Sequence, residues 1–213
     1  MGGKVQMNVF ESTSMLTGLI YNDEDIIERN NKEQEYLNYI RTHVSHVIQA
    51  FDNLILPLKE KTNICSTVGD QDLYNAIDKL SQNINYHDNS KYSDEEFAGY
   101  RARWYPTTME AKGDEEYQNR VEEVYQECWN HHRFNNPHHP DYWVNRETGV
   151  SKDMDLDAIL EMICDWEGVS AQFCGNTLEW YENDATEEKK ALSDNTKTIL
   201  EDLLYNVIHN TKV

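Results

Sequence analysis

Apolar residues recur three and four positions apart along most of the chain, which is the period of helices that bury one face. In the first such stretch, Tyr36, Ile40, Val47 and Leu54 fall on the same side. Residues 1–23 carry no clean period and are predicted to form an irregular lead-in. The pattern predicts helices over residues 24–58, 70–87, a segment beginning at 93, 114–133, 153–168, 176–182 and 184–209.

Several residues mark the expected ends of these helices. Pro57 should stop the first helix, and Asp70 is a candidate N-cap for the second. Ser93 to Glu96 matches a capping box, and either Ser151 or Asp153 would cap the helix that follows them. Residues 106–113 are predicted to be a linker. We therefore expect an all-α helical bundle in a single domain over 24–213, with a core in 36–171 and C-terminal helices in 176–209.

Composition narrows the class of protein. At 213 residues the chain can bury a core of its own, and 13 Tyr with 5 Trp argue against disorder. The formal charge of −20 would repel a phosphate backbone, which makes long nucleic acids unexpected partners. No apolar run approaches the roughly 18 residues of a membrane span. The four cysteines form no C-x-x-C pair, so reduced thiols and a cytoplasmic location are expected. The aromatic-rich segment 125–143 is compatible with a homo-oligomer.

The strongest chemical signal is the pair His87-Asp88, followed closely by Lys91. Imidazole nitrogen and carboxylate oxygen together suit Mn, Fe, Zn or Ni, but such a pair also occurs at ordinary helix ends. In the first helix, the 100° step per residue turns His43 inward and His46 outward. An inward histidine is more often a core residue than a ligand, so His43 matters only if other ligands meet it.

Further candidates lie later in the chain. His132 falls on the apolar stripe of its predicted helix, and His138 and His139 are held between Pro137 and Pro140. Asn136 can cap a short turn with Pro137 at its first position, which would fix the direction of both histidines. Asp165 falls on the side of its helix that carries Met154, Ala158 and Met162, where a carboxylate needs a partner.

In this order, the candidates resemble the HD-domain superfamily of helical, metal-dependent phosphohydrolases. That resemblance implies one divalent metal held by His43, His87, Asp88 and Asp165. Some branches of the superfamily insert a further His and a His-His pair and hold two metals, and His132, His138 and His139 look like that insertion.

A closer resemblance is to a small, uncharacterised family of phage and bacterial proteins. The shared motifs are His87-Asp88-Asn89-Ser90-Lys91, Asn136-Pro137-His138-His139, Tyr142-Trp143 and Glu161-Met162-Ile163-Cys164-Asp165-Trp166, with Trp129 and His132 between them. This family carries no assigned function, so only the superfamily resemblance implies chemistry.

The superfamily resemblance implies a metal-dependent phosphohydrolase that acts on a nucleotide or another small phosphoester. Asp88 would hold metal and act as a base, and Lys91 would neutralise a phosphate oxygen. Arg101 and Arg103 are either solvated charges or phosphate-facing groups. Two alternatives stay open: a di-iron oxygenase of the HD type, and a non-catalytic phage or bacterial protein that sequesters a nucleotide or a host partner.

Overall fold

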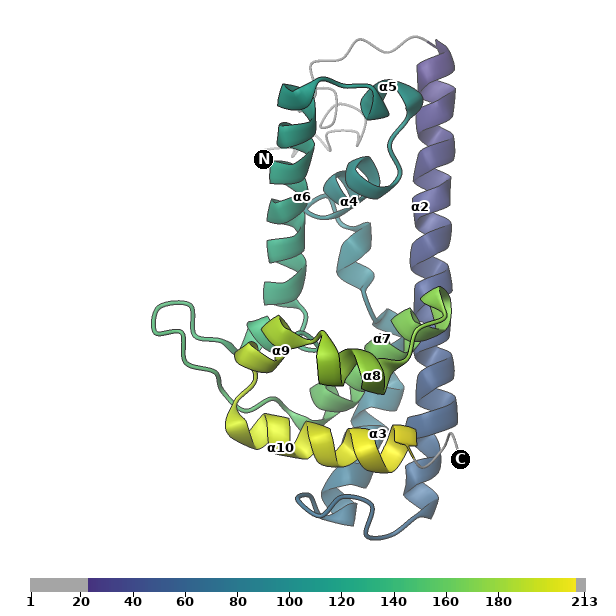
Figure 1. Cartoon of the computed structure of the whole chain (residues 1–213). Helices are drawn as coiled ribbons and strands as arrows, with labels where there is room; N and C mark the ends of the chain where they lie inside the picture. The colour runs from purple at the N-terminus through teal and green to yellow at the C-terminus, as the bar shows by residue number, and fades with distance from the viewer. Residues whose placement is uncertain (1–22, 210–213) are drawn as a thin grey trace, which may run out of the picture. The chain divides into compact units, whose positions relative to one another are not determined.

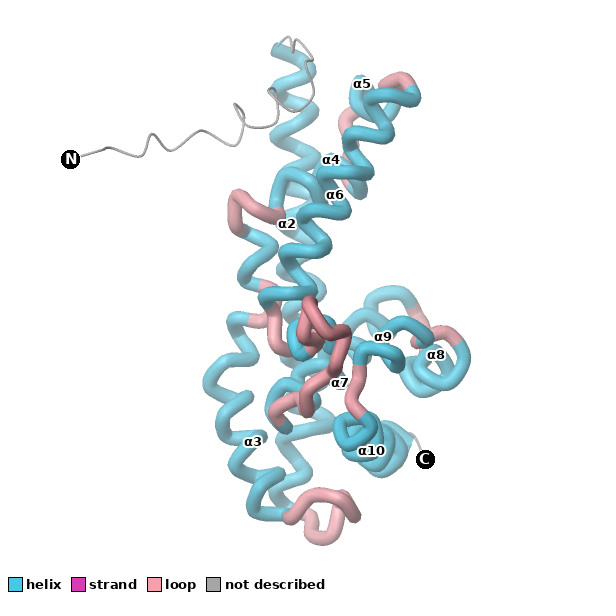
Figure 2. Tube along the Cα trace, turned by 90° about the vertical axis from the view of Figure 1, so that its left-hand side faces the viewer, coloured by secondary structure: helices cyan, strands magenta, loops and turns pink. Residues whose placement is uncertain are grey.

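A computed structural model describes residues 23–209, and its elements are helices and turns (Figure 1). No strand occurs within that range, where the one pairing of this kind is an isolated bridge between Val144 and Ser151 (Figure 2). The predicted all-α class is confirmed, and the predicted lead-in lies almost wholly outside the described residues. The helices are α2 Asp23–Ala50, α3 Asp70–Asn83, α4 Phe97–Trp104, α5 Thr108–Ala111, α6 Glu115–Asn135, α7 Leu156–Phe173, α8 Thr177–Asn183, α9 Thr186–Ala191 and α10 Asp194–Leu203. Short π or 3-10 turns are η1 Phe51–Ile55, η2 Leu56–Glu60, η3 Ile84–Tyr86, η4 Asn89–Tyr92, η5 Pro140–Trp143 and η6 Leu204–His209.

The described chain divides into two compact units. Unit 1 contains residues 23–40 and 89–132, and unit 2 contains residues 41–88 and 133–209. Helices α2 and α6 each contribute residues to both units.

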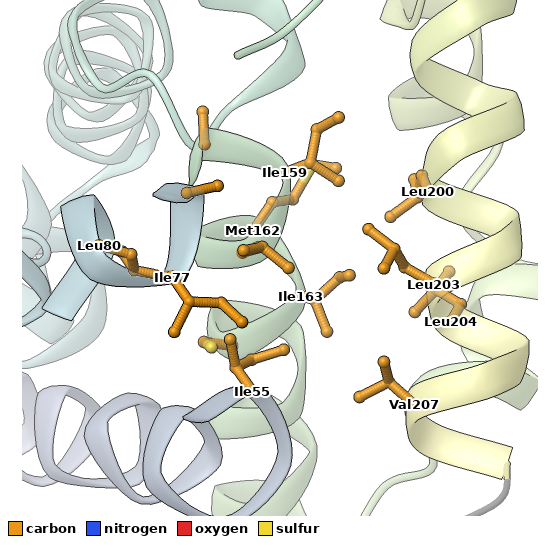
Figure 3. Close-up of a cluster of buried hydrophobic side chains, with 14 of the residues drawn as sticks. Ile55, Ile77, Leu80, Ile159, Met162, Ile163, Leu200, Leu203, Leu204 and Val207 are labelled. Carbon is orange, nitrogen blue, oxygen red and sulfur yellow. The ribbon is translucent and has the colours of Figure 1, made fainter. Parts of the chain in front are cut away.

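Unit 2 is built around α7, which is apolar on most of its surface. Ile159, Leu160 and Ile163 are completely buried. Figure 3 shows α7 between α3, which contributes Ile77 and Leu80, and α10 with η6. Each such side chain contributes about 1.5–3 kcal/mol on burial. The apolar side chains of residues 158–164 are thus enclosed by neighbouring helices, whereas Val169 and Phe173 near the end of α7 are exposed.

A glycine sets the distance between α7 and the second half of α2. A Cβ built on Gly168 would lie 2.8 Å from Val47 Cγ2 and 3.1 Å from the Val47 backbone nitrogen. Because the backbone nitrogen cannot turn aside, the close packing requires glycine here. His43 lies one turn before Val47, and Asp165 lies almost one turn before Gly168. The close contact therefore brings two predicted ligands toward each other.

Unit 1 joins the first half of α2 to α4 and α6 through aromatic and charged contacts. The Tyr36 ring stacks with Tyr100 at 6.3 Å between centroids. Arg101 and Glu110 form a fully buried ion pair, with Nη2 at 2.7 Å from Oε1. Thr107 and Glu110 also make a capping box for α5, so the predicted linker 106–113 contains a short helix.

Some predicted helix ends differ from the observed ones. Pro57 does not stop the first helix, because α2 already gives way to η1 at Phe51, and Pro57 lies at the start of η2. That position leaves a backbone N–H without a helical partner, so proline costs nothing there. Gly69, rather than Asp70, is the N-cap of α3, and the Asp70 carboxylate accepts from the Asn63 N–H at 3.0 Å.

Two further carboxylates serve tertiary contacts instead of caps. Helix α4 starts only at Phe97 and has no side-chain cap, because Glu96 contacts histidines of α6. Asp155 takes the N-cap position of α7, while Asp153 accepts from Ser193 Oγ at 2.6 Å. Helix α7 also continues past the predicted end at 168 to Phe173, and the predicted helix 184–209 is divided into α9, α10 and η6.

Candidate metal centre

His43 is the first residue of the candidate centre in unit 2. It lies on α2 and is 2% exposed, as the inward prediction required. Its Nε2 is 3.0 Å from Asp165 Oδ1 and 3.4 Å from Asp88 Oδ2. The neighbouring His46 is half-buried, and it contributes no atom to this group.

The pair His87-Asp88 follows the η3 turn and faces the same point. Both residues are buried, and Asp88 has a left-handed backbone with φ of 58°. Aspartate and asparagine tolerate this conformation better than most residues. His87 Nε2 lies 3.7 Å from Asp88 Oδ1 and 3.6 Å from Asp165 Oδ1. The reversal of the chain at Asp88 thus brings both side chains toward His43 and Asp165.

His138 completes the group. It is 2% exposed, and its Nε2 lies 3.6 Å from Asp88 Oδ1. Its ring is 4.4 Å from that of His87 between centroids. Within unit 2, the structure places His138 beside His87 and Asp165. The second set that the sequence predicted for His138, with His132 and His139, stays a prediction.

The spacing of these donor atoms fits a divalent cation. The atom pairs described above are 3.0 to 3.7 Å apart. A transition metal at about 2.1 Å from each ligand separates neighbouring donors by about 3.0 to 3.4 Å. If the donor atoms moved closer together by a few tenths of an ångström, their spacing would match that around such an ion. Three imidazoles and two carboxylates provide more donors than a tetrahedral structural zinc site needs.

Glu161 orients two of the histidines, a role that the sequence did not predict. Its Oε1 lies 2.8 Å from His87 Nδ1 and 3.3 Å from His138 Nδ1. When both Nδ1 atoms carry hydrogen and donate to this carboxylate, both Nε2 atoms keep their lone pairs for a metal. Glu161 stands one helical turn before Asp165, so the i, i+4 spacing within the Glu-Met-Ile-x-Asp motif was the available signal.

The electrostatics of the group favour charged acids. Burial opposes ionisation, yet the hydrogen bonds and charges of His138 and His87 lower the pKa of Glu161 to about 2. The pKa of Asp165 is well below its usual range, because His43 and His87 outweigh its burial. Burial would lower the pKa of His87, but Asp88, then Asp165 and Glu161, raise it to about 10. Glu161 and Asp165 are thus ionised beside these imidazoles, and a divalent cation would compensate their negative charge.

A cleft of about 360 Å³ opens beside this group within unit 2. Asp88, His138 and Glu161 form part of its lining. Its other residues are Lys79, Leu80, Asn83, Tyr86, Asn136, Pro137, Tyr142, Trp143, Asp155, Asp157 and Ala158. The candidate centre therefore borders a space large enough for a small molecule.

Other predicted site residues have different surroundings. In unit 1, His132 Nδ1 lies 2.9 Å from Glu96 Oε2 and 3.2 Å from Ser90 Oγ. Lys91 is in η4 with its ammonium 5.7 Å from the centre of the Tyr100 ring. His139 belongs to unit 2, and its ring is 4.4 Å from that of His138 between centroids. The second metal and the phosphate role of Lys91 stay predictions.

The two arginines are engaged within unit 1. Arg101 is 1% exposed and binds Glu110 through both terminal nitrogens, so its guanidinium has no room for a phosphate. Arg103 pairs with Glu122 at 2.8 Å and lies over the Trp104 ring. We do not include either arginine in the proposed site.

The described part of the chain contains no helix that is long and apolar enough to cross a membrane. A search of curated proteins gave no match, and neither did a search of solved structures. A family model matches residues 32–206, a range that includes every residue of the candidate centre. The chain therefore belongs to DUF5662, a family of unknown function.

Proposed function

We propose that the protein is a metal-dependent phosphohydrolase that acts on a small phosphoester. The observation that supports this most is the convergence of five side chains of unit 2, two of which contact the half-buried Glu161 carboxylate. A divalent ion at this position would lower the pKa of a bound water toward about 7 and polarise a phosphoryl oxygen.

The residues of the chain have separable tasks. His43, His87, Asp88, His138 and Asp165 would hold the ion, and Glu161 would keep two of the imidazoles in the required tautomer. The Asp88 carboxylate directs one oxygen toward His43 and the other toward His87 and His138, and it can accept a proton from the attacking water. Hydrolysis joins the water oxygen to phosphorus and breaks the ester P–O bond, and the leaving alkoxide takes up a proton.

The proposed relationship to the HD-domain superfamily rests on the same group. His43, the pair His87-Asp88 and Asp165 stand in the order that the superfamily signature requires, and within unit 2 their donor atoms meet. His138 adds a ligand from the loop before η5. Candidate metals are Mn, Fe, Zn and Ni, with one ion in this group and a second only if His132 and His139 contribute.

Elemental analysis of the purified protein tests the proposal. We expect one or more transition-metal ions per chain and hydrolysis of p-nitrophenyl phosphate. Both should be lost in Asp88→Asn, which keeps a side chain suited to the left-handed backbone at this position. His46→Ala, three residues after His43 on α2, is the matched control and should retain both. The absence of metal from all three proteins after reconstitution would overturn the proposal.

The identity of the metal decides the next assay. If the metal is manganese, zinc or nickel, the protein should be assayed for hydrolysis of a panel of phosphoesters. If the metal is iron, oxygen consumption should be measured as well, because it distinguishes a di-iron oxygenase from a phosphohydrolase. A protein that binds a nucleotide and releases it unchanged would instead be the sequestering type.

A further inference from the structure

We infer that the cleft beside the centre selects phosphomonoesters that carry a planar aromatic ring, and that it rejects nucleoside triphosphates. This inference rests on the proposed function, since it assigns the substrate class of the same site. Two features of the cleft lining support it: exposed aromatic rings and an excess of carboxylates.

The aromatic side chains of the cleft expose apolar surface to water, which is energetically unfavourable. Tyr86 is 68% exposed and Tyr142 is 44% exposed, although both line the cleft. Trp143 is fixed in place because its Nε1 donates to the Pro137 carbonyl at 2.8 Å, and the Tyr142 ring packs edge-on against it at 5.2 Å. Fixed rings at a cleft are typical platforms for a stacked base or aryl group.

The charged side chains limit how many phosphates the cleft accepts. Its lining has four carboxylates, Asp88, Asp155, Asp157 and Glu161, against one ammonium, that of Lys79. Lys79 Nζ is itself 2.9 Å from Asp157 and 3.8 Å from Asp155. A divalent ion would reduce the lining charge from −3 to about −1, so a phosphoryl group would meet positive charge at the ion itself and not in the lining as a whole.

Additional phosphates would meet Asp155 and Asp157 with no uncompensated cation among the lining residues. Like charges at this separation repel, and the cleft contains no arginine that could clamp a polyphosphate. Asn83 and Asn136, by contrast, are neutral residues of the lining and add no charge that would repel a phosphorylated sugar. A nucleoside monophosphate has each of the required parts.

The test compares AMP, ribose 5-phosphate and ATP as substrates of the manganese-reconstituted full chain. We expect kcat/KM for AMP to exceed that for ribose 5-phosphate by at least about fivefold, the effect of one stacked ring. It should exceed that for ATP by about tenfold or more. Calorimetry should show the same preference for AMP over ribose 5-phosphate in the Kd.

Variants assign the two preferences to their residues. Tyr142→Ala should lower kcat/KM for AMP by about fivefold more than kcat/KM for ribose 5-phosphate, whereas Tyr142→Phe should keep the preference for AMP. Tyr205→Ala is the matched control, because Tyr205 is also 44% exposed and lies outside the cleft. The double variant Asp155→Asn/Asp157→Asn should raise the use of ATP relative to AMP.

The possible outcomes distinguish a failure of the substrate selection from a failure of the proposed function. Equal use of AMP and ribose 5-phosphate, with no effect of Tyr142→Ala, would overturn the aromatic selection and leave the phosphohydrolase standing. Efficient hydrolysis of ATP by the unaltered protein would overturn the charge selection. If the metal-loaded protein hydrolyses neither monoester nor p-nitrophenyl phosphate, both the inference and the proposed function fall.

Discussion

Removal of the Glu161 carboxylate should weaken metal binding although Glu161 is not itself a proposed ligand. Its Oε1 contacts Nδ1 of both His87 and His138 at 2.8 and 3.3 Å, and its side chain is only 19% exposed. Loss of such an orienting partner typically costs 10- to 100-fold in metal affinity, which corresponds to about 1.4 to 2.8 kcal/mol. Since two histidines depend on Glu161, the effect should be graded with the substitution.

Glu161→Gln keeps a carbonyl oxygen that can accept from both Nδ1 atoms but loses the negative charge, so the Kd for Mn²⁺ should rise by about tenfold. Glu161→Ala removes both contacts, and the Kd should rise by about 100-fold. Isothermal titration of the metal-free proteins measures these values. Thermal unfolding without metal shows whether each variant keeps its fold.

Glu179→Gln is the matched control, because it removes the same charge from an exposed position on α8. Its Kd should equal that of the unaltered protein. Affinities of Glu161→Gln and Glu161→Ala within twofold of the unaltered protein would refute the orienting role. The histidines would then hold their positions through packing alone.

Three further predictions concern packing, charge and thiols. Gly168→Ala should destabilise the fold by about 1–3 kcal/mol in urea unfolding and reduce metal content, because the new Cβ collides with Val47; stabilisation, as alanine's higher helix propensity alone would give, would contradict it. The Arg101 guanidinium outweighs burial and lowers the pKa of Glu110, so the pair stabilises the fold above the ordinary carboxyl pKa of 4.5 and loses that effect as pH falls. Glu110→Gln should therefore cost about 3 kcal/mol at pH 7 and progressively less below pH 4.5 in urea titrations; a constant difference would exclude this linkage. Iodoacetamide should modify Cys174 first, since the other cysteines are buried and burial raises the pKa of Cys128 to about 11; peptide mass spectrometry that finds Cys128 alkylated earlier would disprove it.

The sequence alone determined the helical class and much of the centre. The recurrence of apolar residues at three and four placed His43 inward, and it placed Asp165 on a buried side of α7. Both conclusions follow from local geometry, because the 100° step fixes which residues share a face of a helix. The adjacent pair His87-Asp88 is recognisable from the chemistry of its two side chains, without reference to their surroundings.

The tertiary structure decided which candidates meet. No periodicity links His138, on a loop, to Asp88, and the 3.6 Å between their donor atoms depends on how the chain returns after α6. Glu161 was visible only as part of a motif until the fold brought two imidazoles to its carboxylate. Arg101 and Glu96 show the reverse. Glu110 binds the Arg101 guanidinium, which the sequence left open as solvated or phosphate-facing, and histidines of α6 contact the Glu96 carboxylate that local rules assigned to a helix cap. Local sequence sets the direction of a side chain within its helix, whereas its partners depend on packing between segments distant in the chain.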